Sequence, residues 1–116
     1  MDQRLFFPAT KRNREPICDV LSKILPQKGS VLEIASGSGE HGVAFQQRFP
    51  NLCWQASDPD PSYRRSISAW INYQGLSKTM PQPIDLDVLK RPWPLTEEFK
   101  SSIQTIVCIN MIHISP

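Results

Sequence analysis

The sequence predicts an α/β protein in which helices cover both faces of a parallel β-sheet. Short apolar runs alternate along the chain with segments of helical periodicity, and right-handed crossovers then place the helices against the sheet. A glycine turn, Ser36-Gly37-Ser38-Gly39, follows the first apolar run directly. Ligands of such sheets bind beyond the carboxyl ends of the strands, so this turn marks the candidate site.

The composition is that of an ordinary globular domain. The 116 residues are 40% hydrophobic and 21% charged, with a net charge of +2. This charge is too mild to indicate nucleic acid or an anionic membrane as a partner. No apolar run approaches the about 20 residues of a membrane span. The three separated cysteines have no metal-binding spacing, so we expect reduced thiols in a cytoplasmic setting and no metal site.

Two prolines delimit the first predicted helix. Residues 1–15, polar and basic after an aromatic start, are predicted to form a solvated arm. Pro16 suits the first turn of a helix, and Pro26 ends it. The apolar residues between them recur on one helical face: Ile17, Val20, Leu21, Ile24 and Leu25. The predicted domains are therefore an arm at 1–15 and one α/β domain at 16–116.

The later elements continue the alternation. Residues 31–35 form the first strand, and Glu40 begins a helix that Pro50 closes. Asp60 is a good N-cap for the next helix and Gly75 a good left-handed C-cap. In chain order the remaining predicted elements are a strand at 53–57, a helix from Pro61 to Gly75, a strand at 83–88, a short helix from Thr96 and a fourth strand at 103–109.

The glycine turn fits two kinds of ligand. Residues 37–42 satisfy the pattern GxGxxG, and Asp58 after the second strand would bind ribose hydroxyls in a dinucleotide site. The alternative role of Asp58 is that of a turn former before Pro59. Glu33 favours another ligand, because a carboxylate inside an apolar strand is costly without a partner. We expect Glu33 at the end of its strand, with a polar or cationic partner such as a ligand that carries an ammonium group and a sulfonium centre.

These residues carry a family resemblance. The segment Glu33-Ile34-Ala35-Ser36-Gly37-Ser38-Gly39 resembles the first motif, E/DxGxGxG, of class I S-adenosylmethionine-dependent methyltransferases. Over nearly its whole length the chain more closely resembles the DUF938 group, also called methyltransferase-like protein 26, in the segments KRNREPI, LEIASGSGEH, SDPD, IDLDV and CINMIHISP. The resemblance implies a Rossmann-like methyltransferase sheet with parallel strands in the order 3-2-1-4. It also implies S-adenosyl-L-methionine as the cofactor.

The resemblance further implies roles for individual residues. Glu33 would orient the methionine part of the cofactor, and Asp58 would accept hydrogen bonds from its ribose hydroxyls. Asp87 is the expected contact to the adenine amino group, with Asp85 as the second choice. The other implied cofactor-binding residues are Ala35, Ser36, Gly37, Ser38 and Gly39 in the turn, Asn110 and Met111 after the fourth strand, and Arg12 and Asn13 from the arm.

Departures from the family pattern limit what the sequence says about the reaction. Ala35 stands where the motif usually has its first glycine, and the NPPY-type sequence of amino-group methyltransferases does not follow the fourth strand. His113 is the one candidate general base, and its alternative role is that of a polar loop residue. Methyl transfer depends mainly on orientation, because the sulfonium donor is already activated. The methyl acceptor is therefore not identified.

The fourth strand would lie at the edge of the sheet and is apolar on both faces. An apolar edge invites pairing with another chain. We expect either self-association through this strand or a neighbouring strand in a longer methyltransferase of which these 116 residues are a fragment. Activity of the chain alone is left open. Two other functions compete: a nucleotide- or NAD-binding Rossmann domain, which Glu33 argues against, and a non-catalytic interaction module.

Overall fold

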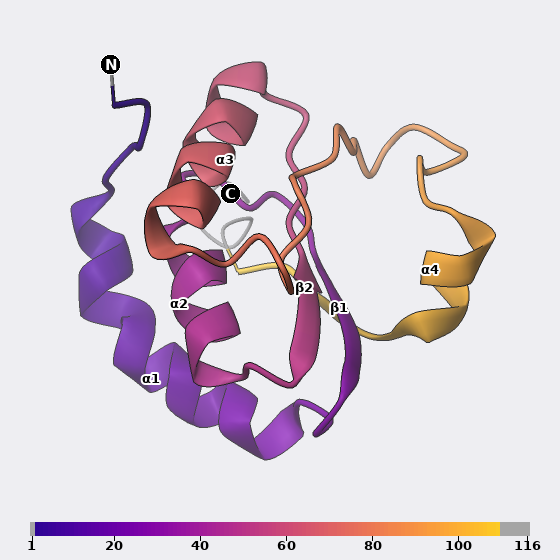
Figure 1. Cartoon of the computed structure of the whole chain (residues 1–116), viewed down its shortest axis with the longest axis horizontal. Helices are drawn as coiled ribbons and strands as arrows, with labels where there is room; N and C mark the ends of the chain where they lie inside the picture. The colour runs from indigo at the N-terminus through magenta and orange to yellow at the C-terminus, as the bar shows by residue number, and fades with distance from the viewer. Residues whose placement is uncertain (1, 110–116) are drawn as a thin grey trace.

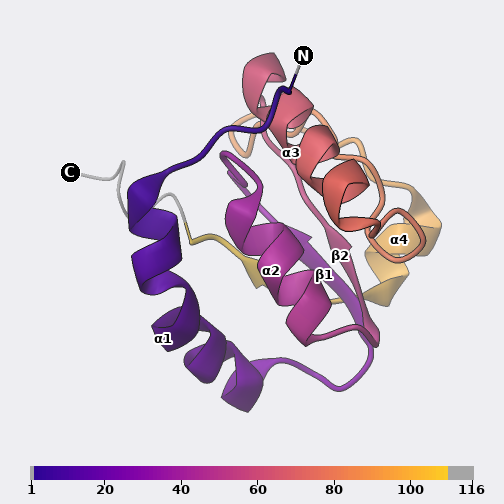
Figure 2. The ribbon, with the colours of Figure 1, turned by 60° about the vertical axis from the view of Figure 1, so that its left-hand side comes forward.

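The chain folds in three layers around a parallel sheet. The computed structural model describes residues 2–109, apart from the side chains of residues 8–11. The sheet consists of β1 (Gly29–Glu33), β2 (Leu52–Gln55) and β3 (Ile103–Val107), in the order β2-β1-β3. Helices α1 (Pro8–Ile24), α2 (Glu40–Arg48) and α3 (Pro61–Gln74) cover one face, and α4 (Glu97–Ser102) lies on the opposite side of the sheet (Figures 1 and 2).

The central strand β1 defines the topology. It pairs in parallel with β2, where Leu32 is opposite Gln55, and with β3, where Leu32 is opposite Ile106. Beyond β2, an isolated parallel bridge joins Ser57 to Ile84. The predicted α/β fold with parallel strands is confirmed, and the bridge occupies the place of the third strand in the predicted order.

Two predicted elements differ from the structure. α1 begins at Pro8 instead of Pro16, so residues 8–15 of the predicted arm are helical and Pro16 lies inside the helix. Proline is favoured in the first turn of a helix, where it loses no hydrogen bond, and the sequence offers both Pro8 and Pro16 for that position. In the structure Pro8 occupies it. Residues 83–88 form the single bridge at Ile84 instead of a strand. Pro83 has no N–H to give to a ladder, which weakens strand pairing there.

The termini of α3 and α4 agree with the sequence. The Asp60 carboxylate accepts a hydrogen bond from the Ser62 N–H at 2.8 Å, and Gly75 ends α3 with a φ of 67°. Thr96 caps α4, because its hydroxyl accepts a hydrogen bond from the Phe99 N–H at 3.0 Å. Such caps each stabilise a helix by about 1 kcal/mol.

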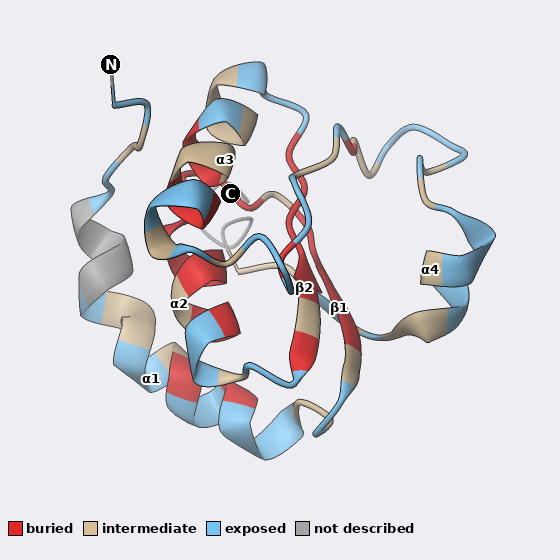
Figure 3. Ribbon diagram, in the orientation of Figure 1, coloured by how far each residue is buried: buried red, intermediate tan, exposed pale blue. Residues whose placement is uncertain are grey.

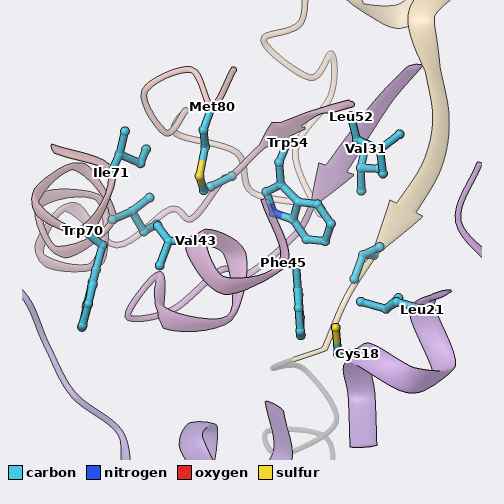
Figure 4. Close-up of a cluster of buried hydrophobic side chains, with 13 residues drawn as sticks. Cys18, Leu21, Val31, Val43, Phe45, Leu52, Trp54, Trp70, Ile71 and Met80 are labelled. Carbon is cyan, nitrogen blue, oxygen red and sulfur yellow. The ribbon is translucent and has the colours of Figure 1, made fainter. Parts of the chain in front are cut away.

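The hydrophobic core has one part on each face of the sheet. The larger part lies under α1, α2 and α3 and includes Phe45, Trp54 and Ile67, all with no exposed surface (Figure 4). The smaller part includes Leu32 and Leu86 and packs against the loop before α4. Burial is concentrated on β1 and β2 and on the turn that follows β1 (Figure 3). Among the described residues, no helix has both the length and the apolar character that a membrane crossing requires.

Candidate functional site

The turn between β1 and α2 is built on three residues in the left-handed region. Ala35, Gly37 and Gly39 have φ values of 54°, 62° and 93°. Gly39 also packs closely on α3, since a Cβ atom there would lie 2.9 Å from the Ile67 Cα. Glycine adopts this conformation freely, whereas an L-residue is destabilised by about 1–2 kcal/mol. Ala35 is therefore the strained position of the turn.

Glu33 is the last residue of β1 and has no exposed surface. Its Oε1 accepts a hydrogen bond from the Trp54 Nε1–H at 3.1 Å, whereas its Oε2 has no hydrogen-bond partner among the described residues. Burial raises the pKa of this carboxyl to about 7, and the indole hydrogen bond opposes the rise in part. The structure thus places Glu33 at the end of its strand, with a polar partner, as predicted.

The third glycine of the turn pattern, Gly42, brings α2 onto this carboxylate. A Cβ atom at position 42 would lie 2.9 Å from Glu33 Oε1 and 3.2 Å from Trp54 Nε1. The Met80 Cε atom would also lie at 3.2 Å. The first turn of α2 and the acid therefore occupy adjacent positions with no room for a side chain between them.

Hydrogen bonds join the ends of β1 and β2 at the turn. Asp58 accepts from the Gly37 N–H at 3.0 Å through Oδ2 and from the Asp60 N–H at 2.9 Å through Oδ1. Ser57 N–H donates to Ser36 Oγ at 3.0 Å, and Ser36 N–H donates to the Ser57 carbonyl at 2.8 Å. Burial raises the pKa of the Asp58 carboxyl, although these two amides lower it. Each carboxylate oxygen keeps a lone pair for a further donor, such as a hydroxyl.

Asp85 and Asp87 lie beside the end of β2, next to a surface cavity. Asp87 Oδ1 accepts a hydrogen bond from the Leu89 N–H at 2.9 Å. Asp85 forms a partly exposed ion pair with Arg64 at 3.3 Å. The cavity has a volume of about 390 Å³ and is lined by Pro59, Asp85, Asp87, Lys90, Pro92 and Pro94. Because Pro59 follows Asp58, the cavity adjoins the turn after β2.

Two predicted site residues on α1 make no hydrogen bond to the turn, and three others lie outside the described residues. Arg12 is exposed and Asn13 half-buried on α1, and in the described part of the chain neither makes a hydrogen bond to the turn. Asn110, Met111 and His113 lie outside the described residues. Their predicted contacts with the cofactor and acceptor remain predictions.

The aromatic side chains near the site are packing residues. His41 lies in the first turn of α2 and stacks on Phe45, with ring centroids 5.3 Å apart. Trp54 and Trp70 are buried in the larger core, and Trp93 packs half-buried against the smaller one. Trp54 also donates the hydrogen bond to Glu33.

Sequence reasoning missed Ser66, a polar residue of α3 that holds the turn in place. The Ser66 hydroxyl, in α3, donates to the Ser38 carbonyl at 2.5 Å. The Ser38 hydroxyl donates to Glu40 Oε1 at 3.0 Å. One signal could have identified Ser66: it lies four residues before Trp70 and therefore on the same buried face of its helix.

Comparisons with known proteins agree with this architecture. A solved structure from Methanococcus maripaludis, described as a candidate S-adenosyl-L-methionine-dependent methyltransferase, matches with a TM-score of 0.72 and 17% sequence identity. The match covers 92% of this chain and 48% of the other, so this chain spans about half the length of that protein. At this identity the likeness shows the Rossmann-like methyltransferase fold alone. The sequence matches the family described as "Protein of unknown function (DUF938)" over residues 4–116, and the chain therefore belongs to the DUF938 family.

Proposed function

We propose that the chain binds S-adenosyl-L-methionine and forms the cofactor-binding part of a methyltransferase. The observation that carries the proposal is Glu33, a fully buried carboxylate whose Oε2 has no hydrogen-bond partner among the described residues. An unsatisfied buried acid destabilises a protein, and an ammonium group on a ligand would offset that penalty. The fold shared with the Methanococcus maripaludis protein supports the same ligand.

The residues around the turn fit this cofactor. Gly37 and Gly39 give the backbone its sharp turn at the end of β1, because both have a positive φ that glycine adopts freely. Asp58 offers carboxylate oxygens to ribose hydroxyls, and Asp87 borders the adjoining cavity as the proposed acceptor for the adenine amino group. When bound, S-adenosyl-L-methionine supplies a methyl group already activated on its sulfonium. The part played by this chain is to hold and orient the donor.

Calorimetric titration of the full chain with S-adenosylmethionine, S-adenosylhomocysteine and NAD tests the proposal. We expect binding of the first two compounds, which share an ammonium group, in preference to NAD. Glu33→Gln should weaken both by about 10- to 150-fold, because a hydrogen bond to a charged group is worth about 1.5–3 kcal/mol. Glu97→Gln, which changes an exposed acid on α4, is the matched control.

Three outcomes would contradict the proposal. Preference for NAD would indicate the dinucleotide-binding domain instead. An unchanged affinity of a folded Glu33→Gln variant would show that this carboxylate does not face the ligand. Absence of binding of all three compounds would favour the non-catalytic interaction module.

A further inference from the structure

The amino-terminal arm, residues 2–7, runs alongside α3 before α1 begins (Figures 1 and 2). This segment has no helical or strand hydrogen bonds of its own. It is nevertheless attached to the rest of the molecule by hydrogen bonds and ring contacts from several of its residues. The partners of these contacts lie in α3 and in the first turn of α2.

Two backbone N–H groups of the arm donate hydrogen bonds to Ser66 and Glu40, the side chains that also bond to Ser38 in the glycine turn. Leu5 N–H donates to Ser66 Oγ at 2.8 Å, and the Ser66 hydroxyl in turn donates to the Ser38 carbonyl at 2.5 Å. Phe7 N–H donates to Glu40 Oε1 at 2.6 Å. The same oxygen accepts the Ser38 hydroxyl at 3.0 Å. The arm and the centre of the turn therefore share both partners.

The side chains that the arm and the turn share are buried, so a change in their hydrogen bonds would affect the turn. Ser66 has no exposed surface, and Ser38 and Glu40 are 3% and 6% exposed. Loss of the arm would remove one backbone donor from the Glu40 carboxylate and one from the Ser66 hydroxyl. Their bonds to Ser38 would then have to readjust, and with them the backbone of the turn.

A stacked arginine fastens the arm to α3. The Arg4 guanidinium carbon lies 3.7 Å from the Tyr73 ring centroid and 4.9 Å from that of Trp70. Asp2 orients the guanidinium, because Arg4 Nη2 donates to Asp2 Oδ2 at 2.7 Å. Trp70 Nε1–H donates to the Leu5 carbonyl at 3.0 Å. These contacts lie apart from the glycine turn, so they can be removed without substituting any residue of the turn.

We propose that the arm is a strap that sets the conformation of the glycine turn, so that docking of the arm and occupation of the turn by a ligand favour each other. Ser66 is the positioning residue that links the two. The proposal rests on the proposed function for the identity of the ligand, S-adenosylmethionine or its product S-adenosylhomocysteine. Coupling of this kind is reciprocal: a ligand that needs the ordered turn also retains the arm.

Two variants of the full chain release the strap at different places. Arg4→Ala removes the stacked guanidinium at the surface, where failure to fold is not expected. Ser66→Ala removes the shared hydroxyl. Ser68→Ala on the same helix is the matched control, because in the described part of the chain Ser68 makes no hydrogen bond to the arm or to the turn.

The first measurement is amide hydrogen exchange without any ligand. We expect the amides of residues 37–40 to exchange roughly fivefold or more faster in Arg4→Ala and Ser66→Ala than in the wild type. The Ser68→Ala protein should match the wild type. Faster exchange at Leu5 and Phe7 with unchanged exchange in the turn would show that the arm can detach without altering the turn. That result would overturn the proposal.

The second measurement adds S-adenosylhomocysteine. We expect this ligand to slow exchange at Leu5 and Phe7 in the wild type, and to bind Arg4→Ala at least about fivefold more weakly. If the arm only stabilised the fold, the ligand would not slow amide exchange at Leu5 and Phe7. Equal affinity for the wild type and Arg4→Ala would overturn the strap and leave the proposed cofactor binding intact. If the wild type does not bind the ligand, the proposed function fails, and exchange in the ligand-free protein still decides whether the arm sets the turn.

Discussion

Glu33 affects the stability of the protein and its expected binding of a ligand in opposite directions. Burial raises its pKa from 4.5 to about 7 in the folded protein. Between these pH values the folded state binds more protons than the unfolded chain, so the free energy of unfolding falls as the pH rises through this window. Above about pH 7 both states are ionised, and the destabilisation levels off on the order of 3 kcal/mol.

Glu33→Gln should therefore stabilise the protein at pH 8 while it weakens binding of the cofactor. The amide oxygen can still accept the Trp54 hydrogen bond, and the buried charge is gone. We expect a gain on the order of 1 kcal/mol or more at pH 8 and a flatter pH dependence between 5 and 7 than in the wild type, measured by denaturant unfolding. A variant less stable than the wild type at pH 8 would show that the carboxylate is not destabilising in the folded state.

Ala35 is a second residue that destabilises the folded protein, because its backbone φ is unfavourable for a residue with a side chain. Its φ of 54° favours glycine. We expect Ala35→Gly to raise the free energy of unfolding by about 0.5–1 kcal/mol, because relief of the strain exceeds the entropy that glycine adds to the unfolded chain. Ala69→Gly within α3 is the control and should lower stability by about 1 kcal/mol. Thermal unfolding that moves both variants in the same direction would contradict this account.

At the scale of elements, Gln46 fastens α2 to β2. Its Nε2 donates to the Leu52 carbonyl at 2.7 Å, and its Oε1 accepts the Trp54 N–H at 3.0 Å. The side chain is 1% exposed, so Gln46→Leu would leave both backbone groups without partners in the core. We expect a loss of about 2–4 kcal/mol in the free energy of unfolding.

The neighbouring Gln47 provides the control for that measurement. Gln47 is exposed, and its hydrogen bond is to the Gln74 side chain at the surface. Gln47→Leu should change stability by at most about 0.5 kcal/mol. Chemical denaturation of the two variants side by side distinguishes the loss of the buried Gln46 hydrogen bonds from a general effect of replacing glutamine by leucine. Equal losses in the free energy of unfolding for both variants would show that the buried hydrogen bonds of Gln46 do not stabilise the protein.

Elements with local chemistry at their ends could be predicted from the sequence, and elements that depend on distant contacts could not. Asp60 and Gly75 fix the ends of α3 through their own side chain and backbone freedom. The start of α1 at Pro8 could not be chosen from the sequence, because Pro16 offers the same local signal for a helix start. The bridge at Ile84 depends on its partner Ser57, which lies in a different segment of the chain.

The same distinction applies to the site. The glycine turn, Glu33 and Asp58 could be predicted, because glycine and an isolated carboxylate in an apolar strand are visible in the sequence. The sequence could place Ser66 on the buried face of its helix, but it could not predict its partners, because Ser66 bonds to Leu5, 61 residues away, and to Ser38, 28 residues away. Its environment exists only when α3, the arm and the turn have come together.

At the scale of the whole molecule, β3 is the exposed edge of the described sheet. It pairs with β1 on one side, and Ile106 remains 53% exposed. Val20 and Ile24 on α1 are also exposed, at 57% and 63%. A free strand edge with apolar side chains is a template for pairing with another chain. We propose that the isolated chain associates with itself through β3.

Ile106→Lys should therefore reduce self-association. A charged side chain on an edge strand must lose its hydration when a second strand pairs with it, so the dimer is penalised while the monomer stays solvated. Sedimentation velocity over a range of concentrations should show a concentration-dependent average mass for the wild type and a smaller dependence for Ile106→Lys. Leu89→Lys replaces a more exposed residue, 88% accessible, in the loop before α4 and should behave as the wild type. If both substitutions reduce association equally, net charge and not the strand edge is responsible, and a wild type that stays monomeric at all concentrations would show that the edge of β3 does not pair.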